Sequence, residues 1–444
     1  MVLSSVERIC LGKMTLSVLV ALFLVFLDVY RCDEGVCKID KKDDCSDGIS
    51  RVNFRYVLYN VNPSEGFNLR RDVYMRLAIF LKNLNQNSKD YWYLVLPPWN
   101  HLYHWRSKMI GEQNFLPWSQ FFDLDSMRRF VPVIETKEFM DDVLEGDALD
   151  SVYYLQHFKD AFSKNWTWED KWTFEECREP HSWEYKETEG VSVGTLWGYK
   201  NLKAKEVKCI SFQGGASLLK EILAVSKSRY SVFQRSEIML HDNFGDKTYW
   251  QCRMSMKFAR PLVDEAAAFM KLNFQMDDLF DVVKLRNHGR NQDRTKINAG
   301  SYLCVHLRRR DFLHGRSAEV PSLEYAAEQI QDKLQEQNLT VVFVSTDAPD
   351  DEVLILKQLL KSVTVIQYKA DDKKQKRFKD GGIAIIDQII CSYAKYFIGT
   401  HESTFSFRIQ EEREILGFPP EMTFNRLCGA DKTCTAPSKW TIEL

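Results

Sequence analysis

The sequence lacks an excess of charge of either sign, since 60 basic residues stand against 62 acidic residues in a chain of 444. Such a balance provides no broad positive field, which argues against a nucleic-acid-binding protein and requires any phosphate site to be local. The sequence also lacks low-complexity tracts and sustained repeats, and its 45% hydrophobic and 27% charged residues are typical of a folded protein. Its length is sufficient for two domains, each with a sizeable core.

A hydrophobic run long enough to cross a bilayer, about 20 residues, is also missing. The apolar run Leu16–Leu27 has the pattern of a signal peptide, but no good small-residue cleavage site follows it. Segment 1–32 is therefore either a cleaved signal or an uncleaved anchor. Either one directs the chain to the secretory pathway, where we expect the lumen of the endoplasmic reticulum, with the Golgi left open. Two glycosylation sequons, at Asn165 and Asn338, agree with this compartment.

Among the eleven cysteines there is no C-x-x-C repeat, so the sequence does not indicate a zinc site. Their number is typical of an oxidising lumen. Two spacings suit disulfide-closed loops, Cys177 with Cys209 and Cys428 with Cys434. Cys304 and Cys391 lie in apolar runs, and we expect them to be buried free thiols.

Several familiar catalytic signatures are absent as well. There is no G-x-x-x-x-G-K-[ST] phosphate loop and no G-x-S-x-G nucleophile elbow. Asp123 with Asp125, and His101 with His104, are the nearest approaches to metal-ligand pairs. Both patterns occur more often by chance or as ordinary surface and packing residues, so we expect no metal.

Alternating strand and helix patterns predict an α/β fold, most clearly in the second half of the chain. The expected strands there are 302–307, 340–345, 363–368 and 396–399, and the expected helices are 322–335, 351–361, 383–394 and 404–415. In the first half we expect strands at 55–61, 91–96, 152–155 and 209–212. The helix and strand signals over 137–199 are irregular, so no elements are placed there in detail. The pattern predicts domains at 51–257 and 258–444 with a ligand cleft between them. We expect the charged run 371–380 to be a solvated loop.

The strand expected at 302–307 is followed by three consecutive arginines, Arg308 to Arg310, and then by Asp311. Ligands bind at the carboxyl edge of open α/β sheets, and a guanidinium fork matches phosphate oxygens bidentately. The arginines with His306 therefore predict an anion site. The alternative is a cluster of arginines paired with surface carboxylates.

The turn Ser64–Asn68 lies between the strand at 55–61 and a helix for which Asn68 is the expected N-cap. Gly66 permits a close backbone approach, and the helix N-terminus offers free N–H groups to an anion. A carboxylate at Glu65 is poorly suited to bind phosphate but well suited to accept a proton. The alternative is that Glu65 only caps the helix.

Two further sites follow later in the chain. Asp387 is a single carboxylate on an otherwise apolar helix face, so it needs a partner, which is either the base or sugar of a nucleotide or a structural arginine. The turn Gly399–Phe405 offers the hydroxyls of Ser403 and Thr404 to a phosphate. Three of the four predicted sites thus belong to the second half, as expected if that half holds most of a nucleotide.

Together these motifs resemble the GDP-fucose protein O-fucosyltransferase family, in particular the branch that modifies thrombospondin type 1 repeats. The resemblance extends from about Tyr56 to Trp440. The pieces that carry it are N-P-S-E-G-F-N-L-R-R-D (62–72), V-L-P-P-W (95–99), L-Y-H-W (102–105), H-L-R-R-R-D-F (306–312), I-I-D-Q (385–388), I-G-T (398–400) and S-T-F-S-F-R (403–408). Ser64 departs from the family pattern, in which a second proline is usual.

The resemblance implies a GT-B-like α/β fold of two Rossmann-type domains with the donor site in the interdomain cleft. It implies inverting transfer of fucose from GDP-β-L-fucose to Ser or Thr hydroxyls, without a metal or other cofactor. By position, Glu65 matches the catalytic base, and Arg308 is expected to stabilise the leaving diphosphate. The donor-site matches are Ser64, Glu65, Gly66, Phe67, Asn68, His306, Leu307, Arg308, Asp387, Thr404 and Phe405. Acceptors of another kind, such as epidermal-growth-factor-like repeats, and a role in client folding with a vestigial nucleotide site stay open.

Overall fold

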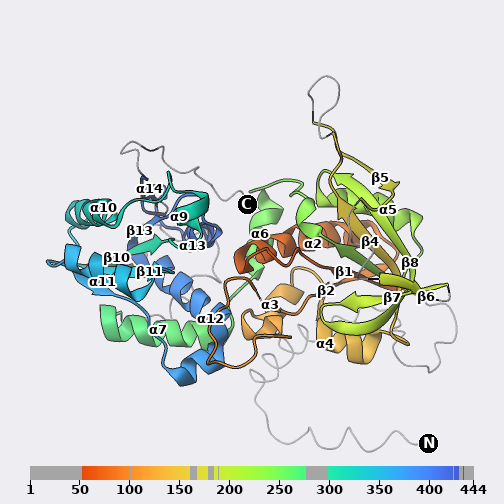
Figure 1. Ribbon diagram of the computed structural model, residues 1–444, viewed down its shortest axis with the longest axis horizontal. Helices are drawn as coiled ribbons and strands as arrows, with labels where there is room; N and C mark the ends of the chain where they lie inside the picture. The colour runs from red at the N-terminus through yellow and green to blue at the C-terminus, as the bar shows by residue number, and fades with distance from the viewer. Residues whose placement is uncertain are drawn as a thin grey trace, which may run out of the picture. The chain divides into compact units, whose positions relative to one another are not determined.

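The computed structural model describes residues 53–100, 102–160, 168–178, 185–188, 190–276, 299–423, 425–429 and 434. The contacts discussed below lie within one compact unit formed by Arg55–Asn87 and by the described residues from Trp92 onward. It contains two separate β-sheets with helices packed on them (Figure 1). The predicted signal segment, the sequon at Asn165 and the residue His101 lie outside the described residues.

The second sheet is entirely parallel and has the strand order β12-β11-β10-β13-β14. Its strands are β10 (Gly300–Leu307), β11 (Val341–Thr346), β12 (Thr364–Ile366), β13 (Ala394–Gly399) and β14 (Asn425–Arg426). Between β10 and β13 the chain changes the direction in which it adds strands. Ligands bind at such a switch point in doubly wound folds.

Helices cover both faces of this sheet. They are α7 (Arg260–Phe274), α9 (Phe312–Gly315), α10 (Leu323–Glu336), α11 (Asp350–Leu359), α12 (Asp372–Ser392), α13 (Thr404–Leu416) and α14 (Pro420–Thr423). Side chains of β10 alternate between the two faces, as a strand requires. Leu303 and Val305 pack in the cluster that includes α10 and α11, whereas Tyr302 and Cys304 pack in the cluster that includes α7 and α12. Both faces of the strand are therefore buried, which explains its continuous apolar sequence.

The first sheet is mixed and has the order β3-β2-β1-β9-β4-β8-β7-β6, with β5 paired to β8. Its strands are β1 (Phe54–Tyr59), β2 (Tyr91–Leu96), β3 (Val133–Glu135), β4 (Ala148–Gln156), β5 (Lys171–Glu175), β6 (Tyr185–Thr188), β7 (Val191–Leu196), β8 (Tyr199–Gln213) and β9 (Tyr230–Gln234). Its helices are α2 (Phe67–Asn87), α3 (Leu124–Arg128), α4 (Thr136–Glu138), α5 (Leu219–Val225) and α6 (Lys247–Ser255). β9 lies between β1 and β4, so the carboxyl end of β1 is also at a switch point.

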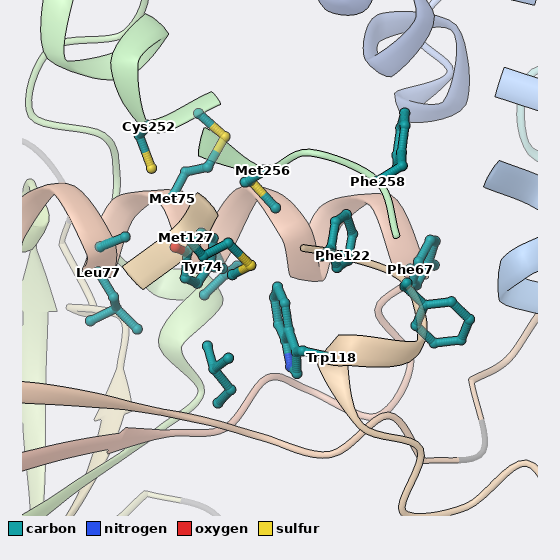
Figure 2. Packing of buried hydrophobic residues seen from close by; sticks show 14 of the residues in the cluster. Phe67, Tyr74, Met75, Leu77, Trp118, Phe122, Met127, Cys252, Met256 and Phe258 are labelled. Carbon is teal, nitrogen blue, oxygen red and sulfur yellow. The ribbon is translucent and has the colours of Figure 1, made fainter. Parts of the chain in front are cut away.

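Helix α2 is anchored by an aromatic cluster (Figure 2). Phe67, its first residue, lies 4.7 Å from Trp99 and 5.7 Å from Trp105 between ring centroids. Seven residues further along α2, the ring of Tyr74 lies 5.1 Å from the ring of Trp118 between centroids. The Trp118 ring in turn lies 5.4 Å from that of Phe122. The motifs V-L-P-P-W and L-Y-H-W thus serve to fix the start of α2, and with it the turn that carries Glu65.

A buried ionic network joins α2, α6 and α13. The side chains of Arg253 and Glu411 are fully buried, and Arg253 Nε lies 2.7 Å from Glu411 Oε2. Glu411 also pairs with Arg408, whose guanidinium lies 3.7 Å from Asp72 of α2. The arginine of S-T-F-S-F-R and the aspartate of N-L-R-R-D therefore meet in the interior, where each charge needs its partner.

Most predicted elements are confirmed within a few residues, but two predictions are wrong. Asn68 is not the N-cap of α2, because the helix begins at Phe67 and Asn68 lies in its first turn. The charged run 371–380 is not a loop: Asp371 caps α12, and the helix starts at Asp372 with a kink at Lys379. Over 137–199, where the strand at 152–155 was the one element expected, the structure has β4, which contains that strand, and also β5 to β7. Their antiparallel pairs have weak local patterns because much of β5 and β6 is exposed.

Three disulfides are present among the described residues. Cys177–Cys209 and Cys428–Cys434 confirm the predicted pairs. The expectation that Cys304 and Cys391 are free thiols is wrong, because they form the third disulfide, with their Cα atoms 5.2 Å apart. Their apolar surroundings reflect burial between β10 and the last turn of α12, which the sequence could not distinguish from burial as thiols. Cys252 is the buried free cysteine of the described chain.

The pair Gly381–Gly382 allows α12 to lie close to the aromatic cluster. A Cβ atom at position 381 would come within 2.6 Å of the Trp105 ring and 2.9 Å of the Phe121 ring. We predict that Gly381→Ala lowers the free energy of unfolding by about 1–3 kcal/mol, because buried rings cannot move aside without cost. Denaturant melts would measure this loss. Gly315→Ala, at a position with no atom near the added methyl group, is the matched control. Equal stability of the two variants would contradict this packing argument.

Within the described part of the chain, no helix is long and apolar enough to cross a membrane.

The predicted domain boundary at 257/258 falls between α6 and α7, and α7 packs on α12 (Figure 1). The division itself stays a prediction.

Candidate functional site

The carboxyl ends of β10 and β13 lie next to each other at the switch point of the second sheet. The hydroxyl of Thr400, which follows β13, accepts a hydrogen bond of 2.9 Å from the backbone N–H of Arg308 and donates one of 3.1 Å to the carbonyl of His306. These bonds fix the backbone at the point where the guanidinium of Arg308 leaves the sheet. The Arg-rich strand end is therefore a rigid feature rather than a mobile loop.

The Arg308 side chain is largely buried and is held by two carboxylates. Its Nη1 donates to Asp347 and its Nη2 donates to Asp311. Asp347 also accepts a bond of 2.6 Å from the backbone N–H of Arg309. A guanidinium with its position fixed on two sides and N–H groups to spare is suited to hold an anion in one orientation.

The other two arginines of the cluster have structural contacts. Arg309 is buried, and its guanidinium donates to Glu352 at 2.7 Å and to the carbonyl of Pro321 at 2.8 Å. Arg310 is exposed and donates to the carbonyl of Asp347 at 2.6 Å. Arg309 thus pairs with a carboxylate, as the alternative interpretation expects, whereas Arg310 meets a carbonyl. Arg308 is paired with carboxylates as well, and its contact with a ligand stays a prediction.

The turn that carries Glu65 leaves the switch point of the first sheet. Arg70 fixes it by donating to the carbonyls of Asn62 and Glu65, both at 3.0 Å. Glu237 accepts a bond of 3.1 Å from the backbone N–H of Asn62. The Glu65 carboxylate itself has no hydrogen bond or ion pair within the described residues, so it does not cap α2 there. Ser64 beside it is exposed and bonds to Asn62.

The environment of Glu65 favours a proton acceptor. Partial burial raises the pKa of its carboxyl group above the ordinary 4.5, and the nearby charge of Glu237 raises it further. Arg70 and Arg76 act in the opposite direction but do not outweigh these effects. A carboxylate whose pKa is raised in this way is a stronger base than an ordinary one.

His104 brings the two halves of the site together. A Cβ atom at Gly66 would lie 3.3 Å from Cδ2 of the His104 ring, so the imidazole lies against the Glu65 turn. Its Nδ1 is 3.4 Å from Nη2 of Arg308. Glu65 and Arg308, which are 243 positions apart in the sequence, therefore lie on either side of one side chain.

Asp387 lies on α12 behind the ends of β10 and β11. One carboxylate oxygen accepts a bond of 2.7 Å from the hydroxyl of Ser345, at the end of β11. The other, Oδ1, is buried and has no partner in the described chain. Burial raises the pKa of Asp387 to about 7. No structural arginine contacts it among these residues, so of the two interpretations, a ligand's N–H or O–H groups suit the unsatisfied oxygen better.

The remaining predicted residues of the second half surround the start of α13. His306 is buried, with its ring 4.3 Å from the Phe405 ring between centroids and its Nδ1 2.8 Å from the Ser406 hydroxyl. Burial and the neighbouring Arg308 lower the pKa of His306 to about 3, so the ring is neutral. Thr404 is the first residue of α13, and no side chain caps this helix end. The backbone N–H groups in the first turn of α13 are therefore suited to bind an anion.

The sequence interpretation gave no role in this site to Asp347, Thr400, Arg70, Glu237 and His104. Thr400 lies within the predicted turn Gly399–Phe405, and His104 was considered only as a metal ligand together with His101. Asp347 and Thr400 each follow a strand of the second sheet, so the strand-end rule could have found them. Arg70 lies within the N-L-R-R-D motif without any feature that distinguishes it from Arg71. Glu237 carries no local signal, because only the pairing of β9 with β1 brings it to the turn.

Of the two candidate metal-ligand pairs, only Asp123 with Asp125 lies wholly within the described residues, since His101 is outside them. In the described chain no group of three or more His, Cys, Asp or Glu side chains is arranged to hold a metal ion. Asp123 accepts a hydrogen bond from the backbone N–H of Ser126 as the N-cap of α3. Asp125 is exposed and lies 3.8 Å from Arg128.

Comparison with known proteins identifies the family to which these features correspond. The model of the family described as "GDP-fucose protein O-fucosyltransferase" matches residues 56–416. The chain is 43% identical over 395 residues to human GDP-fucose protein O-fucosyltransferase 2, which covers 87% of this chain and 90% of the human protein. It is 41% identical over 394 residues to the Caenorhabditis elegans protein of the same name, with the same coverage.

A crystal structure of POFUT1 in complex with GDP has the same fold. The likeness has a TM-score of 0.55 at 16% sequence identity and covers 84% of this chain and 98% of that chain. The predicted GT-B-like α/β fold is thus confirmed.

Proposed function

Since the chain belongs to the GDP-fucose protein O-fucosyltransferase family and is therefore a fucosyl-transferring enzyme, we propose that it transfers fucose from GDP-β-L-fucose, with inversion, to folded thrombospondin type 1 repeats. The observation that carries the proposal is that one imidazole contacts both the Glu65 turn and Arg308. A proton acceptor and an anion-stabilising group at one site are what such a transfer needs.

In the proposed reaction, the acceptor hydroxyl attacks C1 of fucose from the face opposite GDP, and Glu65 takes the hydroxyl proton. The new bond joins C1 to the Ser or Thr oxygen, and the bond between C1 and the phosphate oxygen breaks. Its electrons leave with GDP, and Arg308 stabilises the negative charge that grows there. Because this charge is largest in the transition state, the stabilisation raises the rate rather than only the affinity.

The second half of the chain holds the nucleotide in this proposal. Asp387 accepts N–H groups of the base at its unsatisfied oxygen. His306, Leu307, Thr404 and Phe405 surround the nucleotide at the ends of β10 and the start of α13. Ser64, Gly66, Phe67 and Asn68 bring the N-terminal turn close to the fucose-bearing end. The name of the relatives supports GDP-fucose as the donor, and the POFUT1 complex with GDP shows that this fold accommodates the nucleotide.

The acceptor is the part of the proposal that needs a direct test. Purified protein would be incubated with labelled GDP-fucose and a panel of folded thrombospondin type 1 and epidermal-growth-factor-like repeats. We expect label on the thrombospondin repeats alone. Transfer only to the other repeats would replace the proposed acceptor, and transfer to none would favour the folding-factor role. In that role, a Glu65→Gln protein would still support secretion of its client.

We further propose that the enzyme works in the lumen of the endoplasmic reticulum. Three disulfides in the described chain are typical of an oxidising compartment and rare in the cytosol. Asn338 is exposed, as a glycosylation site must be. Endoglycosidase treatment of the secretory-expressed protein would reveal whether Asn338 is used.

We predict that chelation by EDTA leaves the initial rate within about twofold, since Arg308 takes the role that a divalent ion has in metal-dependent transferases. The measurement is the rate with and without EDTA, followed by addition of manganese. A rate that falls on chelation and is restored specifically by manganese would show that the Asp123–Asp125 pair had been wrongly dismissed.

We also predict that Glu237→Gln shifts the acid limb of the pH profile of kcat to lower pH. Turnover requires ionised Glu65, so it falls as pH drops through the raised pKa of that group. Removing the negative charge of Glu237 lowers this pKa, and the variant therefore keeps its activity to lower pH. The glutamine retains an oxygen that can accept the Asn62 N–H. The surface variant Glu138→Gln is the control, and a Glu237→Gln profile that coincides with it would refute this coupling.

A further inference from the structure

His104 has no assigned role in the proposed reaction, although it lies between the two groups that do. The backbone that carries it is held firmly. Leu102 is buried, the N–H of Trp105 donates to its carbonyl at 2.8 Å, and the Trp105 ring packs on Phe67 and Phe121. Because this backbone is fixed, the fold determines where the partly exposed imidazole of His104 lies and which groups it contacts.

The partner of His104 determines its protonation state. A guanidinium can only donate hydrogen bonds, so Nδ1 of His104 must be the acceptor in its contact with Arg308 at 3.4 Å. The ring is then neutral and carries its proton on Nε2, which faces the Gly66 side. Partial burial and the positive charge of Arg308 lower the pKa of His104, in agreement with a neutral ring.

With His104 included, three groups of the described chain restrain Arg308. Of its five N–H bonds, Asp347, Asp311 and His104 take three, which leaves two for a ligand. The identity of the third acceptor matters. A third carboxylate would restrain the guanidinium equally well but would repel a diphosphate, whereas a neutral imidazole adds no negative charge.

We propose that His104 is a positioning residue of the donor site, which orients the Arg308 guanidinium towards the diphosphate through Nδ1 and spaces it from the Glu65 turn. This inference rests on the proposed function. It assigns His104 no contact with the reacting atoms, and its effect on the reaction passes through Arg308.

The test compares His104→Asn with His104→Leu in the full-length protein. The two side chains have nearly the same shape, but only asparagine offers an oxygen near the position of Nδ1. We expect the leucine variant to lose about tenfold in GDP affinity and a similar factor in kcat/KM for GDP-fucose, as is typical when a hydrogen bond to a charged group is lost. The asparagine variant should stay within about threefold of the wild type.

Each variant is also made in an Arg308→Ala background, and GDP affinity is measured by calorimetry. If His104 acts through Arg308, His104→Leu has no further effect in that background. Equal losses for leucine and asparagine, or the same leucine loss in both backgrounds, would overturn the inference. If the wild-type protein does not bind GDP, the proposed function is refuted. If the wild-type protein binds GDP and His104→Leu binds it equally well, only this inference is refuted.

Discussion

Replacing Glu65 by glutamine is expected to lower turnover by about 10²–10⁴-fold, the contribution typical of a general base. Glutamine keeps the size and the hydrogen-bonding atoms of the side chain, but it cannot accept a proton at neutral pH. The carboxylate has no partner within the described residues, and the turn around it is held through the main chain by Arg70. The substitution therefore removes a chemical function without removing a structural contact.

The measurements that accompany this variant separate the two interpretations of Glu65. GDP affinity and melting temperature should change little, because neither depends on the proton acceptor. If Glu65 instead served as a helix cap, activity would survive and the free energy of unfolding would fall by up to about 1–2 kcal/mol. An active but less stable Glu65→Gln protein would refute the base mechanism.

Replacing Arg308 is expected to have the second largest effect. Arg308→Ala should lower turnover by at least about 10²–10³-fold, the range found when a donor to a developing negative charge is removed. Binding of the acceptor should change much less. Arg308→Lys should fail as well, because a single ammonium group cannot donate to Asp347, Asp311 and a diphosphate in the planar arrangement that the guanidinium allows.

The control for this pair is Arg316→Ala. It removes the same charge eight positions later, from an exposed side chain that pairs with Glu402, and surface pairs of this kind contribute little to stability. Steady-state kinetics with the donor at saturation would compare the variants. Full activity of Arg308→Lys would show that a point charge suffices, and the diphosphate role of the guanidinium fork would be lost.

Local patterns were sufficient for the second half of the chain. Alternation of apolar strands with amphipathic helices depends on neighbours one to four positions apart, so β10 to β13, α10, α11 and the second half of α12 could be predicted from the residues alone. The position of Arg308 followed for the same reason, since a residue directly after a buried parallel strand must emerge at the carboxyl edge of the sheet. The residues alone also indicated Glu65 as a proton acceptor and Asp387 as a carboxylate that needs a partner, and the resemblance to a family added the expected donor, GDP-fucose.

Features that depend on distant residues were predicted poorly. The antiparallel strands β5 to β7 are partly exposed, so their patterns are weak, and their pairing partners stabilise them. The disulfide between Cys304 and Cys391 spans 87 positions, and an apolar neighbourhood alone does not tell a half-cystine from a buried thiol. The charged run at the start of α12 is polar enough to resemble a loop, yet the N-cap Asp371 and the packing of Phe378 make it helical.

The sequence by itself determined most elements of the second half, which residues follow the strands there, and the family to which the motifs belong. The tertiary structure decided which of those residues share a site. It turned Arg309 towards Glu352, brought Glu237 to the Glu65 turn, and set His104 between Gly66 and Arg308. The physical reason is that a strand or helix is specified by contacts a few residues apart, whereas a site is specified by the packing of elements that are hundreds of residues apart.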